Sequence, residues 1–285
     1  MPLESPEQLR AVCQAGKDAD PRWYVVHRRW SIYVTWALLH FPVQANHVTA
    51  AMMAFGVMGA ALLVPRNPLL NVLGFAALYV SFLCDKIDGE VARYRRSSSV
   101  RGLLLDRLHH LAIEPLVLLA AAWHDWSASH RLSVWMAGWA MMVLGNLVDE
   151  HQHLSAYILF KHVRTVRQRP GRARPIPAAW RRAAAAMRPL KMFRMFITVV
   201  PALAACWALE SFTGLPAIRT YLYVGVAALA VLLLFQALYY YRHQLEAEIA
   251  EQAALLDQNA PVAPTHLRAE IGSAEEQLPR AASRA

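Results

Sequence analysis

The stretch HVTAAMMAFGVMGAALLV, residues 47–64, contains no aspartate, glutamate, lysine or arginine. A transmembrane helix needs about 20 predominantly apolar residues, so this stretch predicts a membrane span. Residues 221–241 are equally free of these charges, and the tyrosines at their end are typical of a membrane interface. The whole chain is 56% hydrophobic and only 17% charged, whereas soluble domains hold roughly 25% charged residues. The composition therefore indicates a membrane protein and argues against a soluble enzyme or a disordered chain.

Four further apolar stretches bring the predicted total to six spans: residues 69–93, 103–123, 132–160 and 192–209. In the first two, acidic and histidine side chains interrupt the apolar run itself, whereas residues 132–160 turn polar only from Asp149 onward. Such side chains are costly inside a bilayer unless they face a cavity and a partner. We therefore expect these two spans to carry the function, through the side chains of Asp85, Asp88, Asp106, His109, His110 and Glu114.

The remaining segments are arranged around this membrane domain. Residues 21–41 mix arginines with tryptophans and tyrosines, which predicts an amphipathic helix in the membrane interface rather than a seventh span. We thus expect an all-α, polytopic membrane domain over residues 21–245, with six transmembrane helices after the interfacial helix. Residues 1–20 are expected to form a cytoplasmic segment without a cleavable signal peptide. Residues 246–285 are expected to form a largely disordered cytoplasmic tail.

Lysine and arginine outnumber aspartate and glutamate by 29 to 20, and their distribution predicts the orientation of the spans. Residues 161–191 hold ten of them and residues 93–101 hold four, whereas the alternate connections hold one each. Because basic loops stay on the cytoplasmic side, we expect both termini in the cytoplasm and the inner (plasma) membrane as the location. Topology and contact with anionic membrane lipids explain the charge, so no nucleic-acid partner is expected.

A set of polar residues repeats at helical spacing on the two unusual spans. The sequence DKIDGEVAR occupies residues 85–93, and Asp106 and His110 follow on the next span. Positions three, four and seven residues apart share one face of a helix, so two such faces predict an oxygen-rich cleft. The carboxylates of Asp85, Asp88 and Asp106 would repel each other at membrane depth without a cation. We therefore expect a hard divalent metal, Mg²⁺ or Mn²⁺, and with it phosphoryl chemistry on a diphosphate.

This arrangement resembles the signature of the CDP-alcohol phosphotransferase family, D-x2-D-G-x2-A-R-x8-G-x3-D-x3-D, which lies across two consecutive transmembrane helices. Seven of its eight fixed positions are present, and the resemblance extends over residues 21–245, including NHVT at residues 46–49. It implies a homodimeric enzyme that transfers a substituted phosphoryl group from a CDP-linked alcohol, such as CDP-diacylglycerol, to an acceptor hydroxyl and releases CMP. It also implies metal ligation by Asp85, Asp88 and Asp106, and contact with the CDP moiety by Gly89, Ala92, Arg93 and Gly102.

The chain departs from the family pattern at His110, where the signature has its fourth aspartate. Histidine has an ordinary pKa near 6.5 against about 3.9 for aspartate, which suits a general base at neutral pH. We expect His110 to act as the catalytic base beside Asp106, with Glu114 one helical turn away orienting its other nitrogen. The missing carboxylate is expected to weaken a second metal site. His109 is a rival for the role of base.

Two other classes of protein remain as alternatives. A catalytically silent homologue would keep the motif and still bind CDP-lipid. An ion- or proton-coupled transporter would also place carboxylates and histidines inside its spans, but it predicts inverted repeats and broken helices, and the two halves of this chain do not align as repeats. The acceptor alcohol, and whether the donor is lipid-linked or soluble, stay open on the sequence alone.

We assign no catalytic role to two further groups of polar residues. Near the end of the fourth span lie Asp149, Glu150, His151 and His153. Acidic and histidine side chains at a helix end are usually solvated, so we interpret this group as surface. Lys191 and Arg194, at the start of the fifth span, are interpreted as basic side chains that reach toward lipid headgroups.

Overall fold

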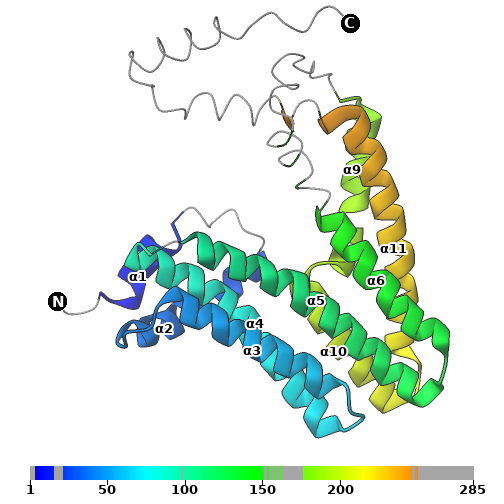
Figure 1. Ribbon diagram of the computed structural model, residues 1–285, viewed down its shortest axis with the longest axis horizontal. Coiled ribbons are helices and arrows are strands. Elements are labelled where there is room, and N and C mark those ends of the chain that lie inside the picture. The colour runs from blue at the N-terminus through cyan, green and yellow to red at the C-terminus, as the bar shows by residue number, and fades with distance from the viewer. Residues whose placement is uncertain are drawn as a thin grey trace, which may run out of the picture. The chain divides into compact units, whose positions relative to one another are not determined.

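The computed structural model describes residues 4–15, 22–97, 99–150 and 176–245, together with residues 153, 157, 161, 248 and 249. Every regular element in this part of the chain is a helix, which confirms the predicted all-α class (Figure 1). The helices are α1 (Pro6–Cys13), α2 (Arg22–Leu39), α3 (Ala45–Leu63), α4 (Pro68–Arg95), α5 (Val100–Ser129), α6 (Leu132–Glu150), α9 (Ala178–Met187), a 3-10 helix (Arg188–Phe193), α10 (Phe196–Thr213), α11 (Ala217–Tyr239) and a π-helical turn (Tyr240–Gln244). His151, most of the basic segment from 161 to 175 and the tail from residue 250 lie outside the described residues.

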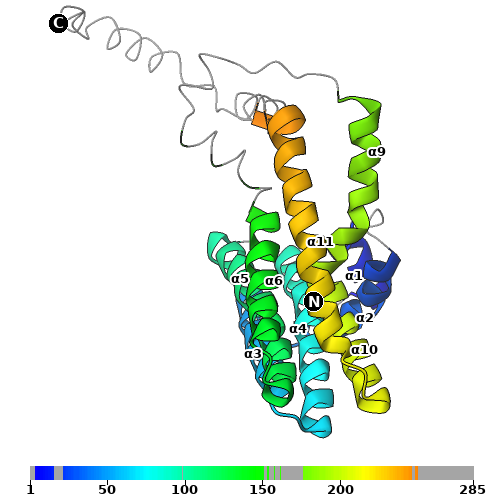
Figure 2. The ribbon, with the colours of Figure 1, turned by 90° about the vertical axis from the view of Figure 1, so that its right-hand side faces the viewer.

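Two compact units divide the chain, and each is described by itself. The first contains residues 1–149 and 182–236, and the second contains residues 150–181 and 237–285. In the first unit, α3 runs alongside both α4 and α5, with α1 and α2 against α4 and with α10 against α4 and α5 (Figures 1 and 2). In the second unit, the ring of Trp180 lies 5.1 Å from that of His243.

Five helices in the described part of the chain are long and apolar enough to cross a membrane. They are α3, α4, α6, α10, and α11 with the residues that follow it to His243. Five such helices are typical of a multi-pass membrane protein, as the composition predicts. The helix α5 is longer than any of them but does not qualify, because charged residues recur along it; Asp106, Arg107 and Glu114 are three of them. The sixth span and the interfacial location of α2 therefore stay predictions.

Close packing between α3 and α4 depends on two glycines. A Cβ atom added to Gly59 would lie 2.9 Å from the backbone oxygen of Gly74 and 2.7 Å from the side chain of Leu78. In lipid, where apolar burial gives little driving force, such small residues allow helices to approach closely. Beside this contact, Asn71 donates to the carbonyl of Leu62 at 3.0 Å and accepts from the indole of Trp207 at 3.2 Å, which ties α10 to the same pair.

The turn between α4 and α5 brings the two halves of the motif together. The cap of α4 is Arg96, whose φ of 49° is in the left-handed region that ends helices. The helix α5 then begins at once, because the side chain of Ser99 accepts from the backbone N–H of Gly102. The last turns of α4 thus carry residues 85–93, and the first turns of α5 carry residues 102–110, on the neighbouring helices that the sequence predicts.

Candidate active site

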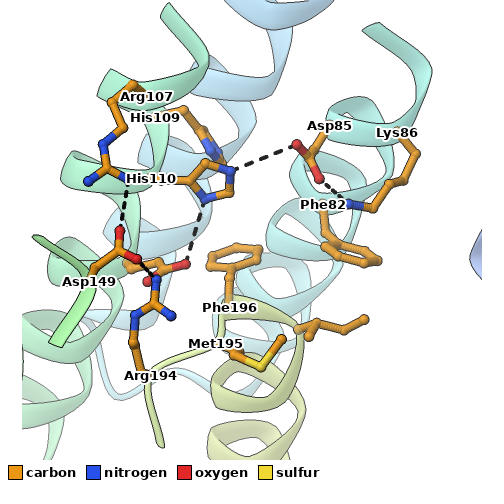
Figure 3. A pocket seen from close by; sticks show the side chains of 12 residues that line it. Phe82, Asp85, Lys86, Arg107, His109, His110, Asp149, Arg194, Met195 and Phe196 are labelled. Atoms are coloured by element: carbon orange, nitrogen blue, oxygen red, sulfur yellow. Dashed lines mark hydrogen bonds and ion pairs between the residues drawn. The ribbon is translucent and has the colours of Figure 1, made fainter. Parts of the chain in front are cut away.

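Asp85, Asp106 and His110 form a group whose possible ligand atoms all lie within 4.8 Å of one another. The Nε2 atom of His110 is 3.9 Å from Oδ1 of Asp85 on α4 and 3.7 Å from Oδ1 of Asp106, one turn back on α5. Figure 3 shows the imidazole of His110 turned toward Asp85 across the space between the two helices. Two carboxylates and one imidazole are a donor set that suits a divalent metal ion.

The second nitrogen of His110 faces another carboxylate. Its Nδ1 atom lies 3.7 Å from Oε1 of Glu114, one turn further along α5. The ring therefore has an acidic group on each side, as the spacing of the sequence predicts. Carboxylates lie beside both nitrogens, so a free lone pair at Nε2 requires a cation that engages Asp85 and Asp106; Glu114 would then hold the ring proton at Nδ1.

Asp88 lies outside this three-residue group, although the resemblance implies that it is a metal ligand. Its Oδ2 atom accepts a hydrogen bond of 2.8 Å from the hydroxyl of Thr49 on α3. It lines the same cavity as Asp85 and Asp106, so the three predicted ligands share one space.

A cavity of about 430 Å³ opens beside these carboxylates, and we name it the motif cavity. It brings together the four residues that the resemblance assigns to the CDP moiety. Its lining comprises Ala45, Asn46, Thr49, Asp85, Asp88, Gly89, Ala92, Arg93, Ser97, Ser99, Gly102, Leu103 and Asp106. The volume falls within the range of small-molecule pockets.

Arg93 and two glycines shape the motif cavity. A Cβ atom on Gly89 would lie 3.2 Å from Nη1 of Arg93, so the guanidinium extends over this glycine. A Cβ atom on Gly102 would lie 3.2 Å from Oδ1 of Asn46. Larger residues at these positions would therefore crowd the cavity. The Nε atom of Arg93 donates to the backbone carbonyl of Cys13 at 2.5 Å, which the sequence does not indicate.

A second cavity, of about 310 Å³, is also lined by Asp85, and Figure 3 shows the side chains around it. We name it the arginine cavity. It is lined by Phe82, Asp85, Lys86, Arg107, His109, His110, Glu114, Asp149, Arg194, Met195, Phe196 and Ile197. Asp85 lines both cavities, so the group with Asp106 and His110 stands where the two spaces meet.

An acid bound by two arginines lines the arginine cavity, and the interpretation of the sequence missed it. Nη1 of Arg107 on α5 donates to Oδ2 of Asp149 at 2.8 Å, and Arg194 pairs with the other oxygen of Asp149 (Figure 3). The interpretation of Asp149 as solvated is therefore wrong, and so is that of Arg194 as a residue facing headgroups. Lys191 is not among the residues that line either cavity. No signal in the spacing predicts these pairs, because the partners are more than 40 residues apart.

His109 is held in the interior of the helix bundle. It is fully buried, and its Nε2 atom lies 3.0 Å from the hydroxyl of Ser81. That hydroxyl donates its one proton to the backbone carbonyl of Met52 at 2.8 Å, so Nε2 must be the donor to Ser81. His110, by contrast, keeps 37% of its side chain exposed. Of the two neighbouring histidines, His110 is the one with access to a ligand.

No protein-family model matches the chain, and no curated protein matches it. The resemblance given by the motif therefore stays an expectation that rests on the residues and their arrangement.

Proposed function

We propose that the protein is a membrane-embedded, metal-dependent CDP-alcohol phosphotransferase. The observation that carries this proposal is the position of Asp85, which lines two polar cavities and lies with Asp106 and His110 at the point where they meet. A transferase of this kind needs a site for the nucleotide-linked donor, a site for the acceptor, and reactive groups between them. The two cavities and the group between them support our assignment of these three parts.

The donor binds in the motif cavity. The small side chains at Gly89, Ala92 and Gly102 leave room for the nucleotide, and the guanidinium of Arg93 offers a rigid pair of donors to the diphosphate. CDP-diacylglycerol suits a site between membrane helices, because its acyl chains stay in the bilayer while its headgroup enters the polar cavity.

The carboxylates fit a divalent metal. Oxygen ligands favour Mg²⁺ or Mn²⁺, and Asp85, Asp88 and Asp106 would hold the ion next to the donor diphosphate. When bound, the metal supplies charge neutralisation and polarises the phosphorus. The Nε2 atom of His110 lies within the same group, but one nitrogen cannot ligate a metal and accept a proton at once. We assign it to the proton.

The acceptor enters through the arginine cavity. His110 removes the proton of the acceptor hydroxyl at Nε2, while Glu114 holds the proton on Nδ1 and stabilises the resulting imidazolium. The acceptor oxygen attacks the phosphorus distal to the cytidine. The bond from that phosphorus to the CMP oxygen breaks, and CMP leaves with the electron pair.

The remaining parts of the proposal concern the setting of the enzyme. We propose cytoplasmic termini, from the distribution of lysine and arginine, and the inner (plasma) membrane as the location; the resemblance implies a homodimer. The basic residues around the motif support the cytoplasmic side, since Arg93 and Arg95 end α4 and Arg101 begins α5.

A catalytically silent CDP-lipid-binding homologue is the second candidate, and His110 favours it, because the family signature has aspartate there. One experiment separates the two. The purified full-length protein is incubated with CDP-diacylglycerol, Mg²⁺ or Mn²⁺ and a panel of alcohols, and CMP release is measured. We expect release with at least one alcohol and none from the Asp85→Asn variant. Nucleotide binding without release would favour the silent homologue, and the absence of both would refute the proposal.

A further inference from the structure

We infer that the N-terminal helix α1 (Pro6–Cys13) is a positioning element for Arg93. The carbonyl of Cys13, the last residue of α1, accepts a hydrogen bond of 2.5 Å from Nε of Arg93. This inference rests on the proposed function, because it gives α1 a part in binding the CDP-linked donor. Neither the motif nor its spacing includes any residue before α2.

The docking of α1 is fixed by apolar contacts. A helix of eight residues has little stability of its own in water. Leu9 and Cys13 are fully buried in one cluster with Ile32 and Leu39 of α2, against which Trp36 and Tyr94 also pack. The N-terminus of α1 is closed by a capping box between Ser5 and Gln8. The helix therefore has one defined position on α2 and α4.

A buried carboxylate on α4 holds the end of α1. Glu90 is fully buried and accepts a hydrogen bond of 2.8 Å from Nε2 of Gln14, the residue that follows α1. It also accepts bonds of 2.6 Å from the hydroxyls of Ser31 and Thr35 on α2. A buried charge is tolerated only when such donors replace its hydration. Gln14 donates in addition to the carbonyl of Arg28 at 2.8 Å, so it links α1, α2 and α4.

Glu90 and Arg93 therefore bind two adjacent residues at the C-terminal end of α1. Glu90 accepts a hydrogen bond from the side chain of Gln14. Arg93, three residues further along α4, donates to the backbone carbonyl of Cys13. The last carbonyls of a helix have no intrahelical partner and carry partial negative charge, so a guanidinium is a suitable partner for that of Cys13. This bond uses Nε alone and leaves Nη1 and Nη2, which lie over Gly89, for a ligand.

The consequence for binding is pre-organisation. An unrestrained arginine side chain loses much rotational freedom when it binds a phosphate, and a side chain already fixed at Nε loses less. The structure thus connects α1 to donor affinity through the orientation of one guanidinium. Among the hydrogen bonds of the described residues, none joins α1 to a residue that lines the arginine cavity, so we expect the acceptor KM not to depend on α1.

The test uses Gln14→Ala in the full chain, with Glu7→Ala as the control. Both replace one polar side chain of the α1 region, but Glu7 is exposed. We expect Gln14→Ala to raise the KM for the CDP-linked donor about three- to tenfold and to leave the acceptor KM unchanged. Glu7→Ala should change neither constant.

A double-mutant cycle shows whether the effect passes through Arg93. In an Arg93→Lys background, which has no Nε donor to Cys13, Gln14→Ala should raise the donor KM by less than about twofold. An effect of equal size in both backgrounds would overturn the inference, because α1 would then act on the fold in general.

The labelling of Cys13 by a maleimide reports the docking of α1 without any substrate. Burial, and then the neighbouring Glu90 carboxylate, raise the pKa of the Cys13 thiol to about 11, so the docked thiol should react slowly. Mass spectrometry of the labelled peptide separates Cys13 from Cys84 and Cys206. Faster labelling in Gln14→Ala than in Glu7→Ala is expected.

The two readouts separate failure of this inference from failure of the proposed function. Unchanged labelling, or faster labelling with an unchanged donor KM, would overturn the role of α1 in an active enzyme. A wild-type protein that neither releases CMP nor binds a CDP-linked alcohol would refute the proposed function. That result would also refute the positioning role, even if faster labelling of Cys13 in Gln14→Ala shows that Gln14 holds α1 in place.

Discussion

Nδ1 of His110 lies 3.7 Å from Oε1 of Glu114, and its Nε2 atom lies at the same distance from Oδ1 of Asp106. Glu114 can hold a proton on Nδ1 while Nε2 accepts one from a hydroxyl, which is the arrangement that a histidine base requires. The base role that we propose for His110 depends on this pair.

Replacing His110 should affect the chemical step more than binding. We expect His110→Ala to lower kcat by roughly 10²–10⁴-fold, the usual contribution of a general base, with little change in the donor KM. His110→Asp restores the family signature and should retain activity. Steady-state kinetics of CMP release measure both effects, and full activity in His110→Ala would exclude this residue as the base.

Metal binding should depend on the carboxylates more than on the imidazole. We expect Mn²⁺ bound to the purified protein, measured by electron paramagnetic resonance, to be lost in Asp85→Asn and Asp106→Asn. It should be retained in His110→Ala, because we assign Nε2 to proton transfer. Loss of Mn²⁺ from His110→Ala, with the protein still folded, would show that the histidine is a ligand instead.

Gly102 should tolerate no branched side chain. A Cβ atom there already lies 3.2 Å from Oδ1 of Asn46 and 3.3 Å from the hydroxyl of Ser99, inside the motif cavity. We expect Gly102→Val to raise the donor KM about tenfold or more through this crowding. Gly145→Val is the control, since the nearest atom to a Cβ at Gly145 is 4.0 Å away. Equal effects of the two substitutions on donor KM would contradict the assignment of the cavity.

The contact between Arg107 and Asp149 should contribute to stability and to acceptor binding. Removing one partner of a charge-assisted hydrogen bond in a partly buried site costs about 1.5–3 kcal/mol. We expect Arg107→Ala to lower the midpoint of thermal unfolding and to raise the acceptor KM, with the donor KM unchanged. Arg101→Ala removes an exposed arginine from the same helix and should do neither. A raised donor KM in Arg107→Ala would show that the two cavities are assigned in the wrong order.

The sequence predicts the helical class and the location of the motif well, because both depend on local patterns. Apolar runs predict α3 and α11 within a few residues of their ends, and the spacing of Asp85, Asp106 and His110 places these side chains on neighbouring helix faces. Five of the six predicted spans have the length and composition to cross a membrane.

The contacts that surround the motif could not be predicted in this way. The pairs of Asp149 with Arg107 and Arg194 depend on how α6 and the start of α10 are rotated against α5, which no periodicity specifies. The bond between Arg93 and Cys13 likewise joins residues 80 positions apart. Such contacts follow from tertiary packing. For this reason Asp149 and Arg194, which their residue types alone suggest to be surface residues, line the arginine cavity.

The most direct measurement follows both products of the reaction at once. The full-length protein is mixed with CDP-diacylglycerol, Mg²⁺ or Mn²⁺ and the panel of alcohols, and CMP and the lipid products are quantified by mass spectrometry. The account predicts that CMP and one phosphatidyl alcohol form in equal amounts, only with the metal, and not in Asp85→Asn. Folded protein that forms no CMP with any alcohol, or that forms as much with Asp85→Asn as with the wild type, would contradict it.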